Sequence, residues 1–281
     1  SAGKHVWCEK PMSTTLADST NMAEAAAASA GKTIVGYNYT KNPAVTHARR
    51  LIDSGVIGRV SGFFCRYDVD NEADGNRPWS WRMSRAQSGT GANGDVLSHV
   101  ISVAHFLTGS SISRVVGDYA IVHKERSDSQ SAGQTKTVDN DDMVAALIHF
   151  ENGVKGHIGA SRVTWGRKCG LRWELHGTEG TILYDQERLN ELKLFTRQDN
   201  PATDGFRTIL TGPLHQPYSA FLPNGGHSLG YMDVKICELN ELLTAIETGS
   251  PVWPSFSDGL VIEQVMDAVD RSSISGSWED V

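Results

Sequence analysis

The sequence has few cysteines and no long apolar run, and each shortage excludes classes of protein. Only four cysteines occur among 281 residues, and no two form a C-x-x-C pair. This excludes a zinc-finger pattern and a dense disulfide framework, and it favours a reducing, cytoplasmic location. No apolar stretch approaches the roughly 20 residues of a bilayer-spanning helix, so we expect no membrane partner. Acidic residues outnumber Lys and Arg by 33 to 26, which argues against nucleic-acid binding, because such domains usually carry a basic face.

The pattern of secondary-structure signals changes along the chain. Before residue 40, an alanine-rich helix at 14–30 lies between apolar strands at 5–8 and 32–37, which is typical of a parallel α/β layer. The first residues also read as the end of a helix, so we expect the chain to be the tail of something longer. Later segments alternate with period two, as half-buried strands do. These strands are expected at 63–69, 115–123, 143–150, 154–163, 171–176, 181–184 and 192–195.

The remaining segments complete the expected fold. Glu151-Asn152-Gly153 is a hairpin signal, and the polar segment 126–137 is expected to be a mobile loop. Helices are expected at 43–54, 95–108, 233–248 and 258–272. The predicted fold class is therefore α+β: the remnant of a parallel α/β unit, then a large, mostly antiparallel open sheet with helices on one face.

Two short segments carry the strongest chemical signals. Asp95 and His99 are four residues apart on the expected helix, near its N-terminus. A carboxylate there can orient an imidazole and raise its basicity, as a general base requires; a capped helix start with a satisfied histidine is the alternative. Lys10, within Glu9-Lys10-Pro11, follows a strand. Its ammonium could polarise a substrate oxygen, because ligands of open α/β sheets bind at the carboxyl ends of strands; a surface ion pair is the alternative. Pro11 could be cis.

Four other groups of residues have ordinary explanations. Gly89 to Gly94 matches G-x-G-x-x-G but follows no strand, so we expect a flexible turn and not a phosphate loop. Asp139, Asp141 and Asp142 lack calcium-loop spacing and suggest a solvated strand entrance. The basic residues are expected on a solvated or subunit-facing sheet edge; they are Arg162, Arg167, Lys168 and Arg172. No metal site is expected.

Two aromatic segments could line a pocket. Trp79-Ser80-Trp81-Arg82 could wall a site or stack on a flat ring, or it could simply fill core and surface. A long loop rich in proline and glycine contains His215 and His227 and precedes Tyr231. Such loops often line sites, although substrate contact is not required by the pattern.

Three segments together resemble the Gfo/Idh/MocA family, the glucose–fructose oxidoreductase and inositol dehydrogenase group. The segment 3–11 (GKHVWCEKP) is similar to the family's strand-E-K-P signature. The segment 91–109 resembles its glycine-rich turn, D-x-x-x-H and closing L-T-G, and 175–181 (LHGTEGT) resembles its sheet hairpin. The resemblance covers the whole chain and is strongest to members that act on inositols or anhydrosugars.

The resemblance implies a domain division, a reaction and a set of site residues. Residues 1–40 would be the C-terminal part of a dinucleotide-binding Rossmann domain, and 41–281 a substrate-binding and oligomerisation domain whose last helix could pack back on the first. The implied enzyme transfers a hydride between a CH–OH group of a cyclic polyol or sugar and NAD or NADP, with NAD preferred. Lys10, Asp95 and His99 would be catalytic. The implied cofactor contacts are Glu9, Lys10, Pro11, Asn38, Trp81 and Arg82, and the implied substrate contacts are Lys10, Tyr39, Asp95, His99, His227 and Tyr231.

Two further expectations concern partners and the rival interpretation. An open sheet with one uncovered face usually finds a partner, so we expect a homodimer or homotetramer that buries it. The rival hypothesis is a catalytically silent family member that senses a sugar or nucleotide or acts as a regulatory partner. The complete set of Lys10, Asp95 and His99 argues against this rival, because a sensor needs no base.

Overall fold

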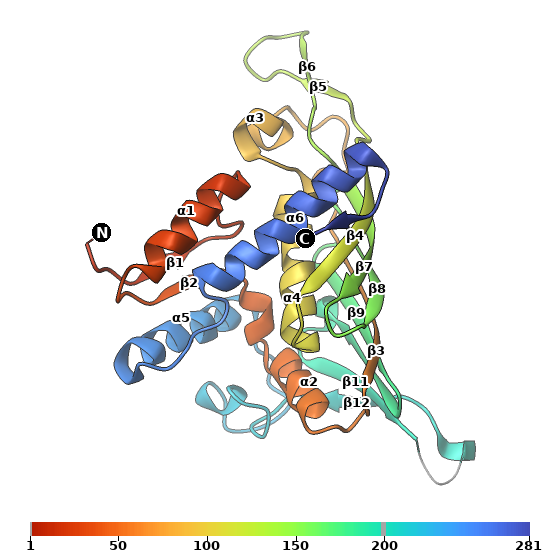
Figure 1. Cartoon of the computed structure of the whole chain (residues 1–281). Coiled ribbons are helices and arrows are strands. Elements are labelled where there is room, and N and C mark those ends of the chain that lie inside the picture. Colours follow the sequence, from red (N-terminus) through yellow and green to blue (C-terminus); the bar gives the residue numbers. More distant parts are fainter. Residues whose placement is uncertain (1, 198–200) are drawn as a thin grey trace.

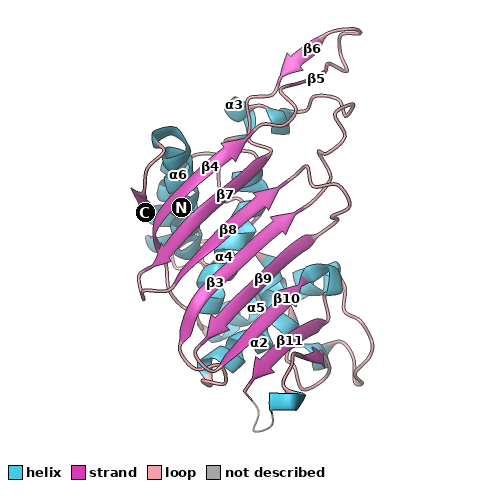
Figure 2. Cartoon of the chain, turned by 90° about the vertical axis from the view of Figure 1, so that its right-hand side faces the viewer, coloured by secondary structure: helices cyan, strands magenta, loops and turns pink. Residues whose placement is uncertain are grey.

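One large sheet, covered by helices on a single face, organises the computed structural model, which describes residues 2–197 and 201–281 (Figures 1 and 2). The sheet has nine strands in the order β12-β11-β10-β9-β3-β8-β7-β4-β13. Every neighbouring pair in it is antiparallel except β3 and β8. The strands are β3 (Val60–Asp68), β4 (Ile112–Ala120), β7 (Met143–Phe150), β8 (Lys155–Ser161), β9 (Gly170–Gly177), β10 (Gly180–Asp185), β11 (Glu191–Thr196), β12 (Arg207–Leu210) and β13 (Glu279–Asp280).

A small parallel unit lies beside this sheet, on the side where the helices are (Figure 1). β1 (Val6–Cys8) and β2 (Thr33–Val35) pair in parallel around α1 (Leu16–Ala27). The other helices are α2 (Pro43–Asp53), α3 (Arg85–Ser88), α4 (Ser98–Thr108), α5 (Tyr231–Thr248) and α6 (Phe256–Ser275). Short helical turns are η1 (Asn38–Lys41), η2 (Trp81–Met83), η3 (Asn93–Leu97), η4 (Gln186–Arg188), η5 (Pro201–Thr203) and η6 (Tyr218–Ala220). The fold class predicted from the sequence is confirmed.

Helix ends follow local sequence signals. Thr15 caps α1 by accepting the N–H of Asp18, and Asn42 caps α2, which begins at a proline whose missing N–H costs nothing there. α6 begins with Ser255, whose hydroxyl accepts from the N–H of Asp258. α4 ends at Gly109, which has a φ of +64° that few other residues adopt.

Period-two alternation separates the two faces of the sheet. On β3, Phe63, Cys65 and Tyr67 are buried beneath the helices, while Arg66 points to the opposite face. On β9, Trp173 is buried in the same way, beside Tyr184 of β10. Burial of these side chains on one face fixes the register of the strands, since a slip of one residue would exchange the faces.

The segment 126–137 is not a mobile loop, as the sequence suggested, but a hairpin. It forms β5 (Glu125–Ser127) and β6 (Thr135–Thr137), which pair antiparallel. Arg126 is only 2% exposed and donates from its guanidinium to the main-chain oxygens of Glu72 and Asp74, both at 2.6 Å. The composition of the segment cannot reveal a buried cation that donates to carbonyls far away in the sequence.

The expected solvated strand entrance at Asp139, Asp141 and Asp142 is wrong for two of its members, because Asp141 and Asp142 are buried. The carboxylate of Asp141 accepts the N–H of Gly91 at 2.6 Å and the N–H of Asn93 at 2.8 Å. A Cβ on Gly91 would lie 1.9 Å from the Asp141 carbonyl oxygen. The glycine-rich turn is therefore closed tightly on a carboxylate, and two of its amides are already occupied.

The basic cluster also divides between the interior and the surface. Arg162 is buried and donates to the main-chain oxygen of Asp141 at 2.9 Å, so its expected solvated position is wrong. Arg167, Lys168 and Arg172 remain at the surface, where each has a carboxylate partner. No helix among the described residues has both the length and the apolar character needed to cross a membrane.

The contact of Asp141 with the glycine-rich turn gives a stability prediction. Asp141→Ala leaves two buried N–H groups without acceptors and should destabilise the protein by about 2–4 kcal/mol. Asp141→Asn keeps one acceptor oxygen and should cost less. Urea unfolding measures both, with exposed Glu247→Ala as the control. Equal midpoints for Asp141→Ala and the control would contradict this account.

Candidate active site

Lys10 lies where β1 ends, in a turn that contains a cis Lys10–Pro11 peptide bond. Its ammonium donates to the Asp95 carboxylate at 2.9 Å and to the Asp95 main-chain oxygen at 2.5 Å. Burial raises the pKa of Asp95, but Lys10, together with Arg162 and Arg82, outweighs burial and leaves the pKa below its ordinary value. Asp95 is therefore a carboxylate that holds a lysine.

The predicted contact between Asp95 and His99 is not found. Asp95 belongs to η3, a π-helical turn in which the N–H of Ser98 bonds to the carbonyl of Asn93, five residues earlier. This wider turn removes the i, i+4 stacking that an α-helix would give Asp95 and His99. The carboxylate consequently pairs with Lys10 and not with the imidazole.

His99 lies in the first turn of α4, inside a cage of tyrosine rings. Its ring centroid is 4.5 Å from that of Tyr39, 5.6 Å from Tyr37 and 5.9 Å from Tyr67. The side chain is 5% exposed, and its Nδ1 has no hydrogen-bond partner among the described residues. Burial, then Lys10 and Lys235, lowers the pKa of His99 well below its ordinary value. The expected rise in basicity is therefore wrong, and the imidazole is neutral at neutral pH.

The tyrosines form a hydrogen-bonded network that sequence reasoning largely missed. The hydroxyls of Tyr39 and Tyr67 are 2.9 Å apart, and Cys169 Sγ lies 3.4 Å from the Tyr67 hydroxyl. Burial raises the pKa of both phenols, so they remain neutral hydrogen-bonding groups. Of the three tyrosines whose rings surround His99, only Tyr39 was expected in the site. The sequence pattern placed Tyr67 only at an apolar position of the strand expected at 63–69. It placed Tyr37 only at the end of the strand expected at 32–37.

Three of the residues expected at the cofactor lie around the same strand ends. Asn38 is buried in η1, and its Nδ2 has no hydrogen-bond partner among the described residues. Glu9 is exposed and forms an ion pair with Lys235 of α5 at 3.1 Å. Pro11 lies near the glycine-rich turn, with its Cγ 3.9 Å from the place of a Cβ on Gly94.

Trp81 and Arg82 form a separate surface feature in η2. The Arg82 guanidinium lies 4.4 Å from the Trp81 ring centroid, and Trp81 is 49% exposed. The Arg82 charge also helps to lower the pKa of Asp95, after Lys10 and Arg162. Trp79 is held by its Nε1, which donates to the carbonyl of Thr137 at 3.0 Å.

The residues expected from the long loop reach the cluster unequally. Tyr231, at the start of α5, has its ring centroid 6.3 Å from that of Tyr39. His227 is exposed, and its main-chain oxygen accepts from the Tyr218 hydroxyl. Within residues 2–197 and 201–281, no hydrogen bond or ring contact joins the His227 imidazole to the cluster. His215 packs against His47 instead, with ring centroids 4.5 Å apart.

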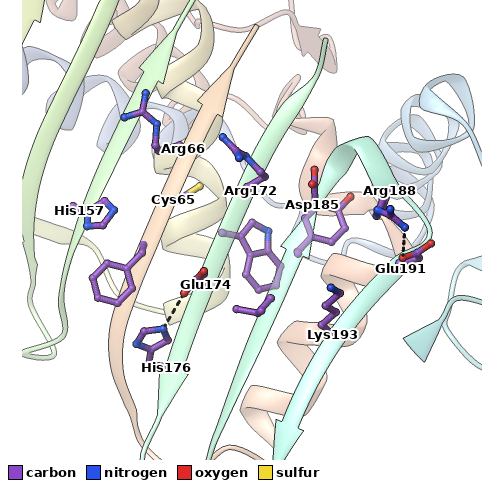
Figure 3. A pocket seen from close by; sticks show the side chains of 14 residues that line it. Cys65, Arg66, His157, Arg172, Glu174, His176, Asp185, Arg188, Glu191 and Lys193 are labelled. Carbon is purple, nitrogen blue, oxygen red and sulfur yellow. Dashed lines mark hydrogen bonds and ion pairs between the residues drawn. The ribbon is translucent and has the colours of Figure 1, made fainter. Parts of the chain in front are cut away.

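A hollow of about 620 Å³ lies on the other face of the sheet and is lined by charged side chains (Figure 3). Arg66 and Arg172 line it from β3 and β9, whereas Tyr67, the next residue on β3, points to His99. Successive side chains of a strand point to opposite faces, so this hollow is separated from the His99 cluster by the sheet. No group of three His, Cys, Asp or Glu side chains that could hold a metal ion occurs in the part of the chain described.

The fold and this cluster define a class of protein. The chain belongs to the Gfo/Idh/MocA family of oxidoreductases. Residues 1–37 match the family model described as "Oxidoreductase family, NAD-binding Rossmann fold", and residues 45–183 match "GFO/IDH/MocA C-terminal domain".

Among its relatives, levoglucosan dehydrogenase of Pseudarthrobacter phenanthrenivorans is 37% identical over 290 residues, covering 100% of this chain and 74% of that protein. Inositol 2-dehydrogenase of Rhizobium meliloti is 25% identical, covering 96% of this chain and 72% of that protein. A solved levoglucosan dehydrogenase in complex with NADH and levoglucosan has a TM-score of 0.95 and 38% identity, covering 100% of this chain and 74% of its own.

The cationic surroundings of His99 give a titration prediction. A neighbouring cation disfavours the imidazolium, so Lys10→Met should raise the pKa of His99 toward its ordinary value. The His99 ring signals, followed by NMR against pH, measure this shift without turnover. Lys193→Met, on the opposite face of the sheet, is the matched control and should leave the titration unchanged. A downward shift in Lys10→Met would contradict the assignment.

Proposed function

We propose that this chain belongs to an NAD-dependent dehydrogenase that oxidises a CH–OH group of a cyclic polyol or anhydrosugar. The observation that carries the proposal is a buried, neutral imidazole beside a lysine ammonium at the carboxyl end of a strand. Oxidation of an alcohol to a carbonyl requires removal of one proton and one hydride from the same CH–OH group. A neutral base can take the proton, while a cation can hold the oxygen.

Lys10 is equipped to hold a substrate oxygen. An ammonium has three donors, and two of them point to the carboxylate and the carbonyl of Asp95. The third donor remains for a hydroxyl that becomes a carbonyl. In this proposal Asp95 orients Lys10, which replaces the sequence-based role of orienting His99. His99 takes the hydroxyl proton, and its low pKa keeps it deprotonated before the reaction.

The surroundings suit a polyol ring. Tyrosine rings surround the imidazole. Three of them contact His99 directly, namely Tyr37, Tyr39 and Tyr67. A fourth, Tyr231, contacts Tyr39. Tyrosine side chains combine apolar ring surface with a hydroxyl, which suits a sugar with CH faces and polar rims. The relatives named for levoglucosan and inositol support this substrate class. His227 stays a proposed substrate contact, although among the described residues no hydrogen bond or ring contact joins its imidazole to the cluster.

The residues also fit a nicotinamide dinucleotide. Asn38 presents a buried amide donor without a partner among the described residues, three residues beyond the carboxyl end of β2, where dinucleotides bind in such sheets. The residues that would hold the dinucleotide are Glu9, Lys10, Pro11, Asn38, Trp81 and Arg82. When bound, the nicotinamide supplies the hydride acceptor. Solved relatives contain NADH, which favours NAD over NADP.

We also propose the domain division at residue 40 and a cytoplasmic location. The division is supported by the parallel unit β1-α1-β2 preceding the large sheet. α6 returns to that unit, since the N–H of Val35 donates to the carbonyl of Pro254, just before α6, at 2.9 Å.

The cytoplasmic location is supported by four cysteines that are all free of disulfides.

Removal of the proposed base tests the function. In the intact protein with NAD, His99→Ala should lower kcat by about 10²–10⁴-fold, while the affinity for NADH stays nearly unchanged. Turnover of a panel of inositols and anhydrosugars measures kcat, and NADH fluorescence measures affinity. His157→Ala, on the opposite sheet face, is the control. Retention of more than a tenth of kcat by His99→Ala would exclude His99 as the base. NADH binding without turnover in the unmutated protein would favour the silent-sensor hypothesis.

We propose that the open face of the sheet is buried against other copies of the chain in a homodimer or homotetramer. It carries no helix (Figure 2) and exposes Leu147 of β7 by 54%. Burial of such apolar surface between copies would be favourable.

A charge placed on this face tests the assembly. Leu147→Glu should convert a dimer or tetramer to smaller species in light scattering, because it puts a charge into the buried interface. Leu243→Glu, exposed on α5, should leave the mass unchanged. A monomer in the unmutated protein at micromolar concentration would refute the assembly.

A further inference from the structure

The helix α6 packs unusually closely on the turn that carries Lys10. A Cβ on Gly259 would lie 2.8 Å from Val35 Cγ2 and 3.1 Å from Met12 Sδ. Only a glycine allows the helix axis to come this near to the strand end and the turn. α6 is thereby fixed against Met12, two residues after Lys10, although the two segments are far apart in the sequence.

Glu263 lies one helical turn beyond Gly259 and makes a direct bond to the same turn. Its Oε1 accepts the N–H of Met12 at 2.8 Å, and the side chain is 6% exposed. Burial raises the pKa of Glu263 to about 7, while the Met12 N–H acts in the opposite direction. No ion pair with Glu263 is found among residues 2–197 and 201–281. Glu263 is therefore a buried carboxyl group, and its observed hydrogen bond is to the backbone amide of Met12.

The turn is consequently held at both ends. At one end the Lys10 ammonium bonds to Asp95; at the other the Met12 amide bonds to Glu263. Pro11 lies between them, next to Gly94 of η3. Both bonds therefore restrain the turn that carries the ammonium.

We infer that Glu263 is a positioning residue that holds the Lys10 turn in its substrate-binding conformation through the Met12 amide. The inference rests on the proposed function, in which Lys10 binds the substrate oxygen. Glu263 itself touches neither the reacting atoms nor the Lys10 side chain in any observed hydrogen bond. When the bond is lost, Lys10 samples other positions, and bound substrate draws it back at a cost in affinity.

The experiment compares E263A with E263Q in the intact protein. Glutamine keeps an acceptor oxygen and resembles the protonated carboxyl that a pKa of about 7 already populates. E263A should raise the polyol KM about tenfold, since a buried amide loses its acceptor, with less than a threefold fall in kcat. E263Q should stay within about twofold of the unmutated enzyme in both constants. General destabilisation would instead lower the apparent kcat and leave KM unchanged.

A second readout needs no activity. Amide hydrogen exchange of the peptide spanning 8–16 should become at least about tenfold faster in E263A and stay protected in E263Q. Ser272→Ala is the control. It removes a buried hydroxyl of α6 that accepts the N–H of Gly117 on β4, and it should not change the exchange rate of the peptide 8–16. If E263A fails to fold, E263D replaces it, because its shorter side chain cannot reach Met12.

Each outcome has a defined meaning. Unchanged exchange and KM in E263A, equal effects of E263A and E263Q, or equal exchange in Ser272→Ala would overturn the inference. Unfolding of both E263A and E263D would assign Glu263 a purely structural role and overturn it too. If the unmutated protein oxidises no polyol, the proposed function fails, and the exchange experiment still decides whether Glu263 holds the turn.

Discussion

The bond between Lys10 and Asp95 is the interaction on which the site depends. It joins the end of β1 to η3, across 85 residues of sequence, and so connects the parallel unit to the helix that carries His99. A lysine held by both a carboxylate and a carbonyl has a fixed position. The same charge, 2.9 Å from Asp95, also disfavours protonation of His99. One ion pair therefore places the cation and helps to set the protonation state of the base.

Burial and cations act together on His99, and this differs from the common carboxylate–histidine arrangement. A carboxylate beside an imidazole raises its basicity, whereas this imidazole lies among tyrosine rings and near two lysines. The result is a base with a low pKa and a weak ground-state affinity for protons. Such a base can still function if the cation that lowers its pKa also lowers the pKa of the substrate hydroxyl. Lys10 is positioned to act on both.

The sequence was most informative where the signal is local. Period-two alternation located the central strands, and the helix expected at 43–54 is found as α2, Pro43–Asp53, because these signals act within a few residues. It failed where burial depends on distant partners. Asp141 looked solvated because nothing nearby in the sequence reveals that Gly91 and Asn93 donate to it. Asp95 was placed against His99 because an α-helix was assumed where the chain forms a π turn. Position and spacing made Lys10 and His99 candidates, and the resemblance implied their catalytic roles. Their electrostatics came only from the structure.

The two faces of the sheet are linked through the register of β3 and β9. Arg66 and Arg172 stand directly opposite each other in this register, and like charges in that position repel. Asp68 removes the conflict, since its carboxylate lies 2.9 Å from each guanidinium and is nearly buried. The same register turns Tyr67 inward to His99. A slip by one residue would bring arginine into the aromatic cage and leave the tyrosine on the outer face. The charge triad on the outer face therefore helps to keep the cage on the inner face correctly assembled.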